Sequence, residues 1–271
     1  MPNHVVTNVK LIGSTQDIQN FWDLFVDTPK EITKPVRKIQ IDDDEVNDDD
    51  DVLIEIDFNK VVPMPEELNI SCDGLVSRLY NEYSKCYNLI NHIQQASQNE
   101  IDSLNTETIL SFLDNVPNLQ DGFYSRIKRS FLGFSIGIAT KDMIENFCQA
   151  IKNYKKHGYA CWYDWCIANW DTKWNAYSQK IFSKNEFSFQ TAWSHPFNII
   201  ELLSKKVPSI LFDVRYADED FGHNFGHYHI KKGKNINLNT YEEGSEDSVK
   251  FACVLHGLNY EQYRMDCEYE G

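Results

Sequence analysis

Four short segments with alternating apolar and polar residues constrain the fold of this chain more than any other feature. They lie at residues 5–12, 52–58, 186–193 and 210–216, and they are rich in β-branched and aromatic side chains. A period of two is typical of a strand that buries one face, and such side chains pack well on that face. The pattern therefore predicts four strands of one antiparallel sheet.

Helical patterns follow the first and third of these segments. Residues 15–26, preceded by an N-cap at Ser14, and residues 197–206 both carry apolar side chains at helical spacing. Residues 226–231 and 234–238 predict a closing hairpin. Two strand–helix–strand halves that share one antiparallel sheet predict an α+β, ferredoxin-like sandwich with its helices on one face.

The middle of the chain has a different pattern. Residues 66–179 carry apolar residues mainly at helical spacing, which predicts a helical insertion into a domain made of residues 1–65 and 180–240. Residues 241–271 form an acidic, aromatic tail, with a helix or a strand expected at 249–255. The fold class is thus an α+β sheet domain interrupted by helices.

The insertion ends in residues 162–177, which hold four of the six tryptophans. On one continuous helix, a single stripe would contain Trp162, Cys166, Trp170, Trp174 and Tyr177. Such a stripe is typical of a core seam, because each indole removes roughly 200 Å² from water. The alternative is a recognition surface, where tryptophan is enriched. The partner-binding candidates are Trp170, Lys173, Trp174, Asn175, Tyr177 and Trp193.

Residues 169–177, NWDTKWNAY, resemble the N-W-G-T-K-W-N-A signature of the YubB ferredoxin-like family, whose members are carried mainly by phages, plasmids and other mobile elements. Residues 57–65 resemble its D-F-N-K-I-I-P-M-P segment, residues 189–196 its F-x-T-A-W-S-P-P segment, and residues 1–5 its start. The resemblance implies a ferredoxin-like fold and a mobile-element protein without an established biochemical activity.

One position departs from the family pattern, since Asp171 stands where the family has glycine. Aspartate is among the residues that best tolerate a positive φ, so a left-handed turn is expected to survive the change. The helix would then end near Trp170, and residues 172–177 would leave it as an extended segment.

The chain is strongly acidic, with 41 acidic and 26 basic residues and a formal charge of -15. This balance argues against direct nonspecific nucleic-acid binding, which depends on lysine and arginine at the phosphates. It suits a protein whose partner presents a basic surface. The seven cysteines contain no CxxC pair, which favours reduced thiols in a cytoplasmic protein, with Cys161 and Cys166 as core thiols. No apolar run is long enough for a membrane span.

Residues 42–51 contain eight carboxylates and no basic residue. A calcium-binding EF-hand loop would need glycine at its sixth position and glutamate at its twelfth, where this chain has Asn47 and Leu53. We therefore expect an exposed, mobile loop here, with an acidic docking segment as the alternative.

Histidines near the end of the predicted sheet form the one cluster with metal-ligand residue types. His227 and His229 would point to the same face of a strand, close behind Asp218. They are either solvated hairpin residues or, with Asp218, ligands of a metal site. No nucleophile-elbow, zinc-protease or phosphate-loop motif is present. We therefore expect no catalytic residue, metal or cofactor.

These features together predict a non-enzymatic, acidic protein-binding module of phage or mobile-element type. It would act on a host protein and inhibit host nucleic-acid handling or defence. The alternative is a metal-dependent phosphoester hydrolase that uses Asp218, His227 and His229.

Overall fold

The computed structural model describes residues 3–25, 56–71, 87–119, 125, 141–239 and 241–270. The chain divides into two units. The sheet unit contains Met1–Pro63 and Cys166–Gly271, and the helical unit contains Met64–Trp165. The acidic segment 42–51, and with it the question of calcium, lies outside the described residues.

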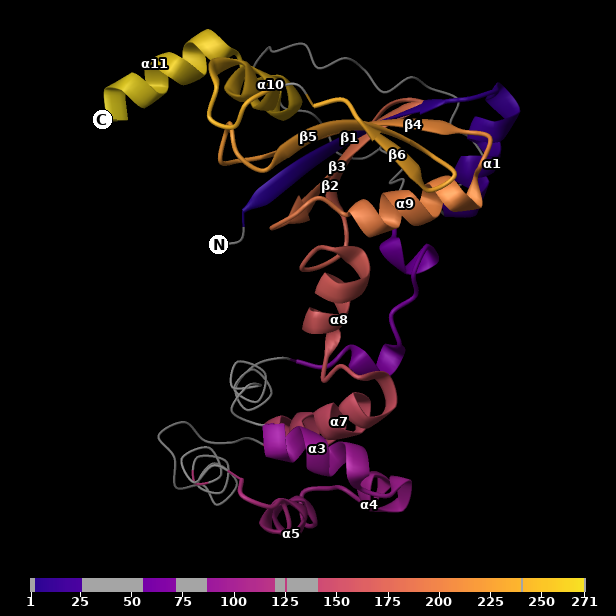
Figure 1. Cartoon of the computed structure of the whole chain (residues 1–271), viewed down its shortest axis with the longest axis vertical. Coiled ribbons are helices and arrows are strands. Elements are labelled where there is room, and N and C mark those ends of the chain that lie inside the picture. Colours follow the sequence, from indigo (N-terminus) through magenta and orange to yellow (C-terminus); the bar gives the residue numbers. More distant parts are fainter. Residues whose placement is uncertain are drawn as a thin grey trace, which may run out of the picture. The chain divides into compact units, whose positions relative to one another are not determined.

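The sheet unit is built on six antiparallel strands in the order β2-β3-β1-β4-β5-β6 (Figure 1). The strands are β1 (His4–Ile12), β2 (Tyr177–Ser183), β3 (Glu186–Ala192), β4 (Leu211–Asp218), β5 (Phe225–Lys231) and β6 (Lys234–Asn237). The strands predicted at 5–12, 186–193 and 210–216 are confirmed, as is the closing hairpin. Alternate residues of each strand face the same side, so one face is apolar and the other carries most of the polar residues.

Helices α1 (Thr15–Phe25) and α9 (Phe197–Lys206) cover the apolar face of this sheet. Phe21 of α1 stacks on Phe187 and meets Phe212 edge to face, with ring centroids 5.8 Å apart in both pairs. The side chains that α9 buries include Ile199, Ile200 and Leu203. Both helices occupy their predicted ranges, and the α+β, ferredoxin-like prediction is confirmed.

The C-terminal region adds α10 (Glu246–His256) and α11 (Tyr260–Glu270). Helix α10 lies on the opposite side of the sheet from α9 (Figure 1), where Phe251 packs on Phe225 with ring centroids 6.0 Å apart. Ala252 and Cys253 are buried there. The residues expected to form a separate acidic tail therefore belong to the sheet unit, because α10 buries an apolar stripe on it.

The strand expected at 52–58 is not one of the six strands among the described residues. Residues 52–55 lie outside the described part, and Phe58–Lys60 is a 3-10 turn instead. Its N-cap is Asp57, whose carboxylate accepts from the Asn59 amide at 2.9 Å. Ile56 pairs with a side chain: its amide donates to Gln179 Oε1 at 2.6 Å, and its carbonyl accepts from Gln179 Nε2 at 3.0 Å. Asp57 is still extended, and its capping carboxylate starts the 3-10 turn at Phe58, the last residue of the predicted strand.

The described part of the helical unit contains η2 (Glu66–Leu68), α3 (Tyr87–Gln95), α4 (Gln98–Asp102), α5 (Ile109–Asp114) and α7 (Lys141–His157). Their buried faces form a core that includes Leu89, Ile93, Ile101, Ile109, Phe147 and Ile151. Helix α8 (Trp162–Trp170) contains the division between the units, at residues 165 and 166. The sequence pattern placed the end of the insertion later, at residue 179.

The cysteines only partly follow the expectation of reduced thiols. Cys148, Cys166 and Cys253 are buried free thiols, and Cys267 is an exposed one. Cys161 is disulfide-bonded, which corrects its prediction as a core thiol. Spacing along the chain could not reveal this bond, because a disulfide depends on which Cβ atoms the fold brings within about 4.5 Å. Within the described residues, no helix combines the length and apolar character of a membrane span.

Candidate functional site

The tryptophan-rich segment is not one helix, because the backbone turns at Asp171. Helix α8 ends at Trp170, and Asp171 adopts φ 63°. Its carboxylate accepts from the Asn198 amide at 2.6 Å and from Asn198 Nδ2 at 2.8 Å. Burial raises the pKa of this carboxyl group. The predicted left-handed turn is therefore present, and the aspartate at this position also caps the first turn of α9.

Trp170 belongs to the core of the sheet unit and is only 3% exposed. Its indole Nε1 donates to the Val62 carbonyl at 3.0 Å, and its ring meets Phe58 edge to face at 5.8 Å between centroids. Trp170 is therefore buried inside the fold and offers little of the exposed surface that its predicted partner-binding role would need. The predicted stripe with Trp174 does not exist, since the turn at Asp171 separates the two residues.

Asn175 is also structural, although its amide was expected to project toward a partner. Its Oδ1 accepts from the Phe58 amide at 3.0 Å and from the Ala176 amide at 2.9 Å. Its Nδ2 donates to Asp57 Oδ1 at 2.6 Å. Asn175 thus joins two segments more than a hundred residues apart, and both ends of its amide are engaged within the fold rather than projecting toward a partner.

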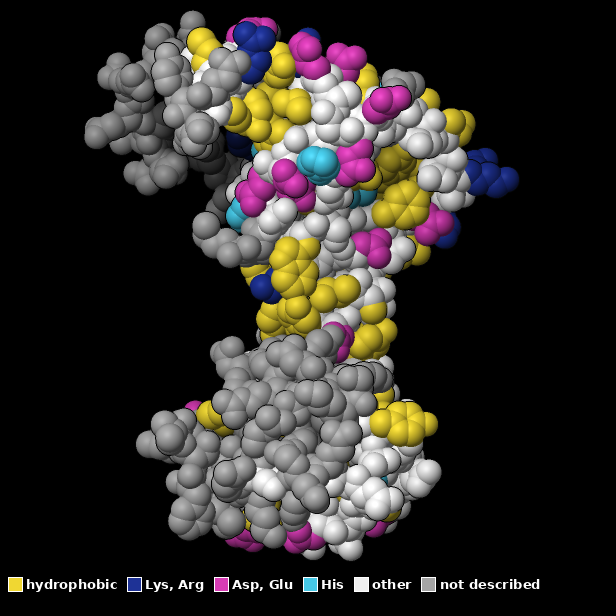
Figure 2. All heavy atoms as spheres, turned by 60° about the vertical axis from the view of Figure 1, so that its left-hand side comes forward, with side chains coloured by type: hydrophobic (Ala, Val, Ile, Leu, Met, Phe, Trp, Pro, Cys, Tyr) yellow, Lys and Arg dark blue, Asp and Glu magenta, His cyan; other side chains and the backbone are white. Residues whose placement is uncertain are grey.

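Four of the predicted site residues lie together at the surface, with Trp193 exposed and the other three half-buried, and we call this group the aromatic–lysine patch: Lys173, Trp174, Tyr177 and Trp193. Lys173 Nζ lies 4.6 Å from the Trp174 ring centroid and 4.8 Å from that of Trp193. Both distances are within the range of cation–π attraction. Trp193 is 39% exposed, and exposed hydrophobic side chains are seen beside a basic one in Figure 2.

Acidic groups lie next to this patch. The Tyr177 hydroxyl is 2.5 Å from His4 Nδ1, and the His4 carbonyl accepts from the Glu219 amide at 3.0 Å. Burial and then the Glu219 carboxylate raise the pKa of Tyr177. The patch therefore has a polar, acidic border at the β4–β5 end of the sheet.

Asp218 does not join the histidines of β5, contrary to the metal-site alternative. It is 2% exposed, and its carboxylate accepts from Asn3 Nδ2 at 3.2 Å, the Asp220 amide at 3.0 Å and Asn224 Nδ2 at 2.7 Å. These contacts shape the turn between β4 and β5. Asp218 is five residues from Asp213 on one strand, so the two side chains leave opposite faces of the sheet.

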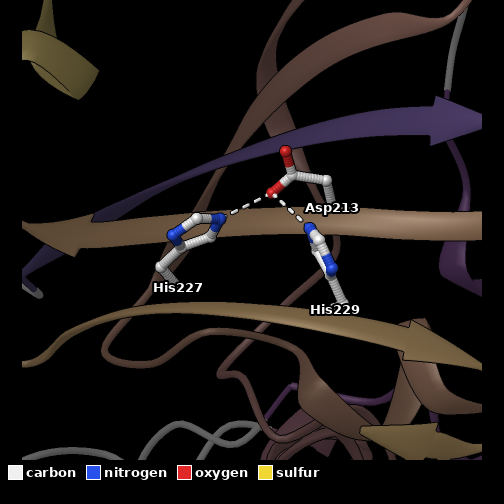
Figure 3. A group of neighbouring side chains, drawn as sticks. All are labelled: Asp213, His227 and His229. Carbon is white, nitrogen blue, oxygen red and sulfur yellow. Dashed lines mark hydrogen bonds and ion pairs between the residues drawn. The ribbon is translucent and has the colours of Figure 1, made fainter. Parts of the chain in front are cut away.

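Asp213 takes the place that was expected for Asp218. In the pairing of β4 with β5, Asp213 lies opposite His229 and Arg215 lies opposite His227. Both imidazoles point their Nε2 atoms at Asp213 Oδ1, at 2.7 Å for His227 and 3.8 Å for His229 (Figure 3). The shared face predicted for the two histidines is confirmed. Asp213 was not predicted as a site residue because it lies inside an apolar strand. Its spacing of two from Arg215, which puts both charged side chains on one face, was the signal that could have identified it.

A second histidine site lies on the apolar face of the sheet. His195 is buried between two hydroxyls, with Nδ1 2.9 Å from Thr7 Oγ1 and Nε2 2.7 Å from the Tyr228 hydroxyl. Its ring stacks on Tyr216 at 4.4 Å. Burial lowers the pKa of His195 to about 3. The imidazole is therefore neutral and satisfied, at the wall of an open hollow of about 460 Å³.

This geometry defines an α+β protein with a ferredoxin-like domain and a partly exposed aromatic–lysine patch. Residues 169–257 match the family model described as the ferredoxin-like domain in Api92-like protein. The ferredoxin-like part of the sequence resemblance is confirmed over that range, whereas the YubB name and its motifs are not confirmed by this match.

One solved structure is similar, the crystal structure of a protein api92 from Yersinia pseudotuberculosis. It is 12% identical and aligns over 90% of this chain and 100% of its own, with a TM-score of 0.34. No curated protein matches the chain.

Proposed function

We propose that this protein is a non-enzymatic protein-binding module of phage or mobile-element type, and that the aromatic–lysine patch is its contact surface. Its target would be a host protein with a basic surface, and binding would inhibit host nucleic-acid handling or defence. The observation that carries the proposal is the Lys173 ammonium held between the rings of Trp174 and Trp193.

The patch has the composition of a binding hot spot. Tryptophan and tyrosine contribute large contact areas with few rotatable bonds, so they lose little entropy on binding. The two rings also restrict Lys173, whose free side chain would lose about 2 kcal/mol of rotamer entropy when ordered by a partner. A preformed lysine–tryptophan arrangement therefore lowers the cost of association.

The backbone at Trp193 supports the same proposal. Trp193 has φ 76°, a conformation that costs a bulky L-residue roughly 1–3 kcal/mol. Two contacts hold it there: its amide donates to the Asn3 carbonyl at 2.9 Å, and its carbonyl accepts from Asn224 Nδ2 at 3.3 Å. The fold thus maintains strain at a residue whose large side chain stays exposed. Such strain is typical of functional positions.

The carboxylates around the patch favour a partner with a basic surface. Glu219 adjoins Tyr177, and further along the same loop His223 Nδ1 lies 2.9 Å from Glu243 Oε1. The hydrogen bond to Glu243 and the charge of Asp220 raise the pKa of His223. This concentration of carboxylates, in a chain of formal charge -15, would attract a basic surface and disfavour a phosphate backbone.

A paired comparison tests the proposal. The Trp174→Ala, Trp193→Ala double variant removes both rings, whereas Ile236→Ala, at a β6 side chain that is 66% exposed, is the matched control. A partner would be crosslinked and identified from host lysate with the parental chain, then purified for direct titration. We expect the double variant to bind at least tenfold more weakly, and the control to bind like the parent.

Two results would contradict the proposal. One is parental affinity in a double variant whose circular dichroism and melting show a folded sheet. The other is an equal loss of affinity in the Ile236→Ala control, which would move the contact surface to the β6 edge. Affinity should also fall as salt rises, because exposed carboxylates are screened beyond about 10 Å at 0.1 M.

A further inference from the structure

We propose that Asp213, His227 and His229 bind one divalent transition-metal ion of the zinc class. This site is separate from the aromatic–lysine patch. The observation is that two Nε2 atoms and one carboxylate oxygen converge from two paired strands (Figure 3). The metal-site alternative drawn from the sequence named Asp218, whereas the geometry points to Asp213.

The distances fit a metal ion with small adjustments. The three ligand atoms all lie within 4.8 Å of one another. A tetrahedral zinc site with bonds of about 2.0–2.1 Å needs ligand atoms about 3.3 Å apart. The contacts of Asp213 Oδ1 with His227 at 2.7 Å and with His229 at 3.8 Å lie on either side of this value. Binding therefore requires His227 Nε2 to move about 0.6 Å away from Asp213 Oδ1 and His229 Nε2 to move about 0.5 Å closer to it.

The sheet makes the arrangement rigid. Asp213 and His229 are directly opposed partners on β4 and β5, and His227 is two residues away on the same face. Backbone pairing on both sides of β4 fixes these positions before any ion binds. Such preorganisation favours metal binding, because ligands on strands hold their geometry better than ligands on loops.

The exposure of the ligands leaves an ion accessible. The side chains of His227 and His229 are 24% and 32% exposed, whereas that of Asp213 is 11% exposed. Two histidines and one carboxylate leave at least one coordination position for water or an anion. This donor set suits zinc, iron, manganese or cobalt better than calcium or magnesium, which prefer all-oxygen ligands.

Arg215 lies against the ligand set: its Nε is 3.5 Å from His227 Nε2, so a bound ion must displace that contact. Its Nη2 donates to Asp213 Oδ2 at 3.2 Å, which leaves Oδ1 to face the two histidines. Hydrogen-bonded carboxylates of this kind are common around metal sites. The guanidinium charge also opposes a bound cation, so we expect Arg215→Ala to bind the ion at least as tightly as the parent. A purely ionic Asp–Arg–His cluster predicts no dependence of metal binding on any of these residues.

The experiment uses the full chain, treated with chelator and carrying Cys267→Ser to remove the exposed thiol. Zn²⁺ is titrated by calorimetry, and Co²⁺ by optical absorption, which distinguishes nitrogen and oxygen ligands from thiolates. The parent should bind one equivalent. His229→Gln and Asp213→Asn should each weaken binding at least tenfold. The control His223→Gln, at a histidine paired with Glu243, should bind like the parent.

Circular dichroism establishes that each variant is folded. If Asp213→Asn fails to fold, His229→Gln decides the question, because that side chain is about a third exposed and its loss is tolerable. The absence of stoichiometric binding by the parent would overturn the proposal. So would metal affinity that survives in His229→Gln, or a cobalt spectrum with thiolate ligands. None of these outcomes depends on the partner of the aromatic–lysine patch, so the two proposals can fail separately.

Discussion

Replacement of His195 by glutamine should remove a large part of the acid sensitivity of the sheet unit. His195 is buried and has its pKa lowered from 6.5 to about 3 by burial. Below pH 6.5, His195 therefore binds a proton in the unfolded chain but stays neutral in the folded chain. The stability linked to His195 is fully present above pH 6.5 and is lost progressively as the pH falls toward about 3.

The size of this effect follows from the two pKa values. Between about pH 7.5 and about pH 5.5, a single histidine with these values lowers the free energy of unfolding by about 1.4 kcal/mol. Asp164 also titrates in this window, because burial raises its pKa to about 7, but it contributes equally to the parent and to the variant. Glutamine retains hydrogen-bonding atoms but does not titrate. The variant should be less stable at neutral pH by about 1–3 kcal/mol, because the Thr7 and Tyr228 hydroxyls lose well-placed partners.

Urea unfolding, followed by tryptophan fluorescence at the two pH values, measures the difference. We expect the parent to lose about 1.4 kcal/mol more than His195→Gln on acidification. His223→Gln is the matched control with the opposite sign. Its raised folded pKa stabilises the protein below pH 6.5 and loses that contribution as the pH rises through the folded value, so this variant should lose more stability on acidification than the parent. An unchanged pH dependence in His195→Gln would refute the reasoning.

Three further substitutions test the structural assignments. Asn175→Ala should lower the free energy of unfolding by about 1–3 kcal/mol, because it leaves the buried Phe58 amide without its acceptor. Lys173→Ala should cost less than about 1 kcal/mol. Equal losses in urea unfolding would contradict the structural role of Asn175. Gly226→Ala should lower the melting temperature, because the new Cβ would lie 2.5 Å from Tyr216 Cε1. This overpacking should destabilise the fold by about 1–3 kcal/mol. A parental melting temperature would show that the tyrosine moves freely. Asp171→Ala should lower the free energy of unfolding by about 1–2 kcal/mol more than Asp171→Gly, as measured by calorimetric melting. Both variants lose the cap of α9, but only alanine is strained by the left-handed φ. The reverse order would be evidence against strain at this turn.

The sequence by itself determined the elements whose pattern is local. Strands β1, β3 and β4 and helices α1 and α9 were predictable because alternation and helical spacing record which side of each segment is buried. The turn at Asp171 was predicted from the family resemblance, which has glycine at this position, together with the tolerance of aspartate for positive φ. Charge alone disfavoured nonspecific nucleic-acid binding.

Tertiary structure decided which side chains meet. Asp213 rather than Asp218 faces His227, because strand register pairs β4 with β5 and alternation places Asp218 on the other face. The internal contacts of Asn175 could not be predicted, because its partners lie near residue 57. Sequence periodicity reports only on residues a few positions apart. Trp170 is buried and Trp193 is exposed although the side chain is the same, since exposure depends on the packing of segments that come together only in the folded unit.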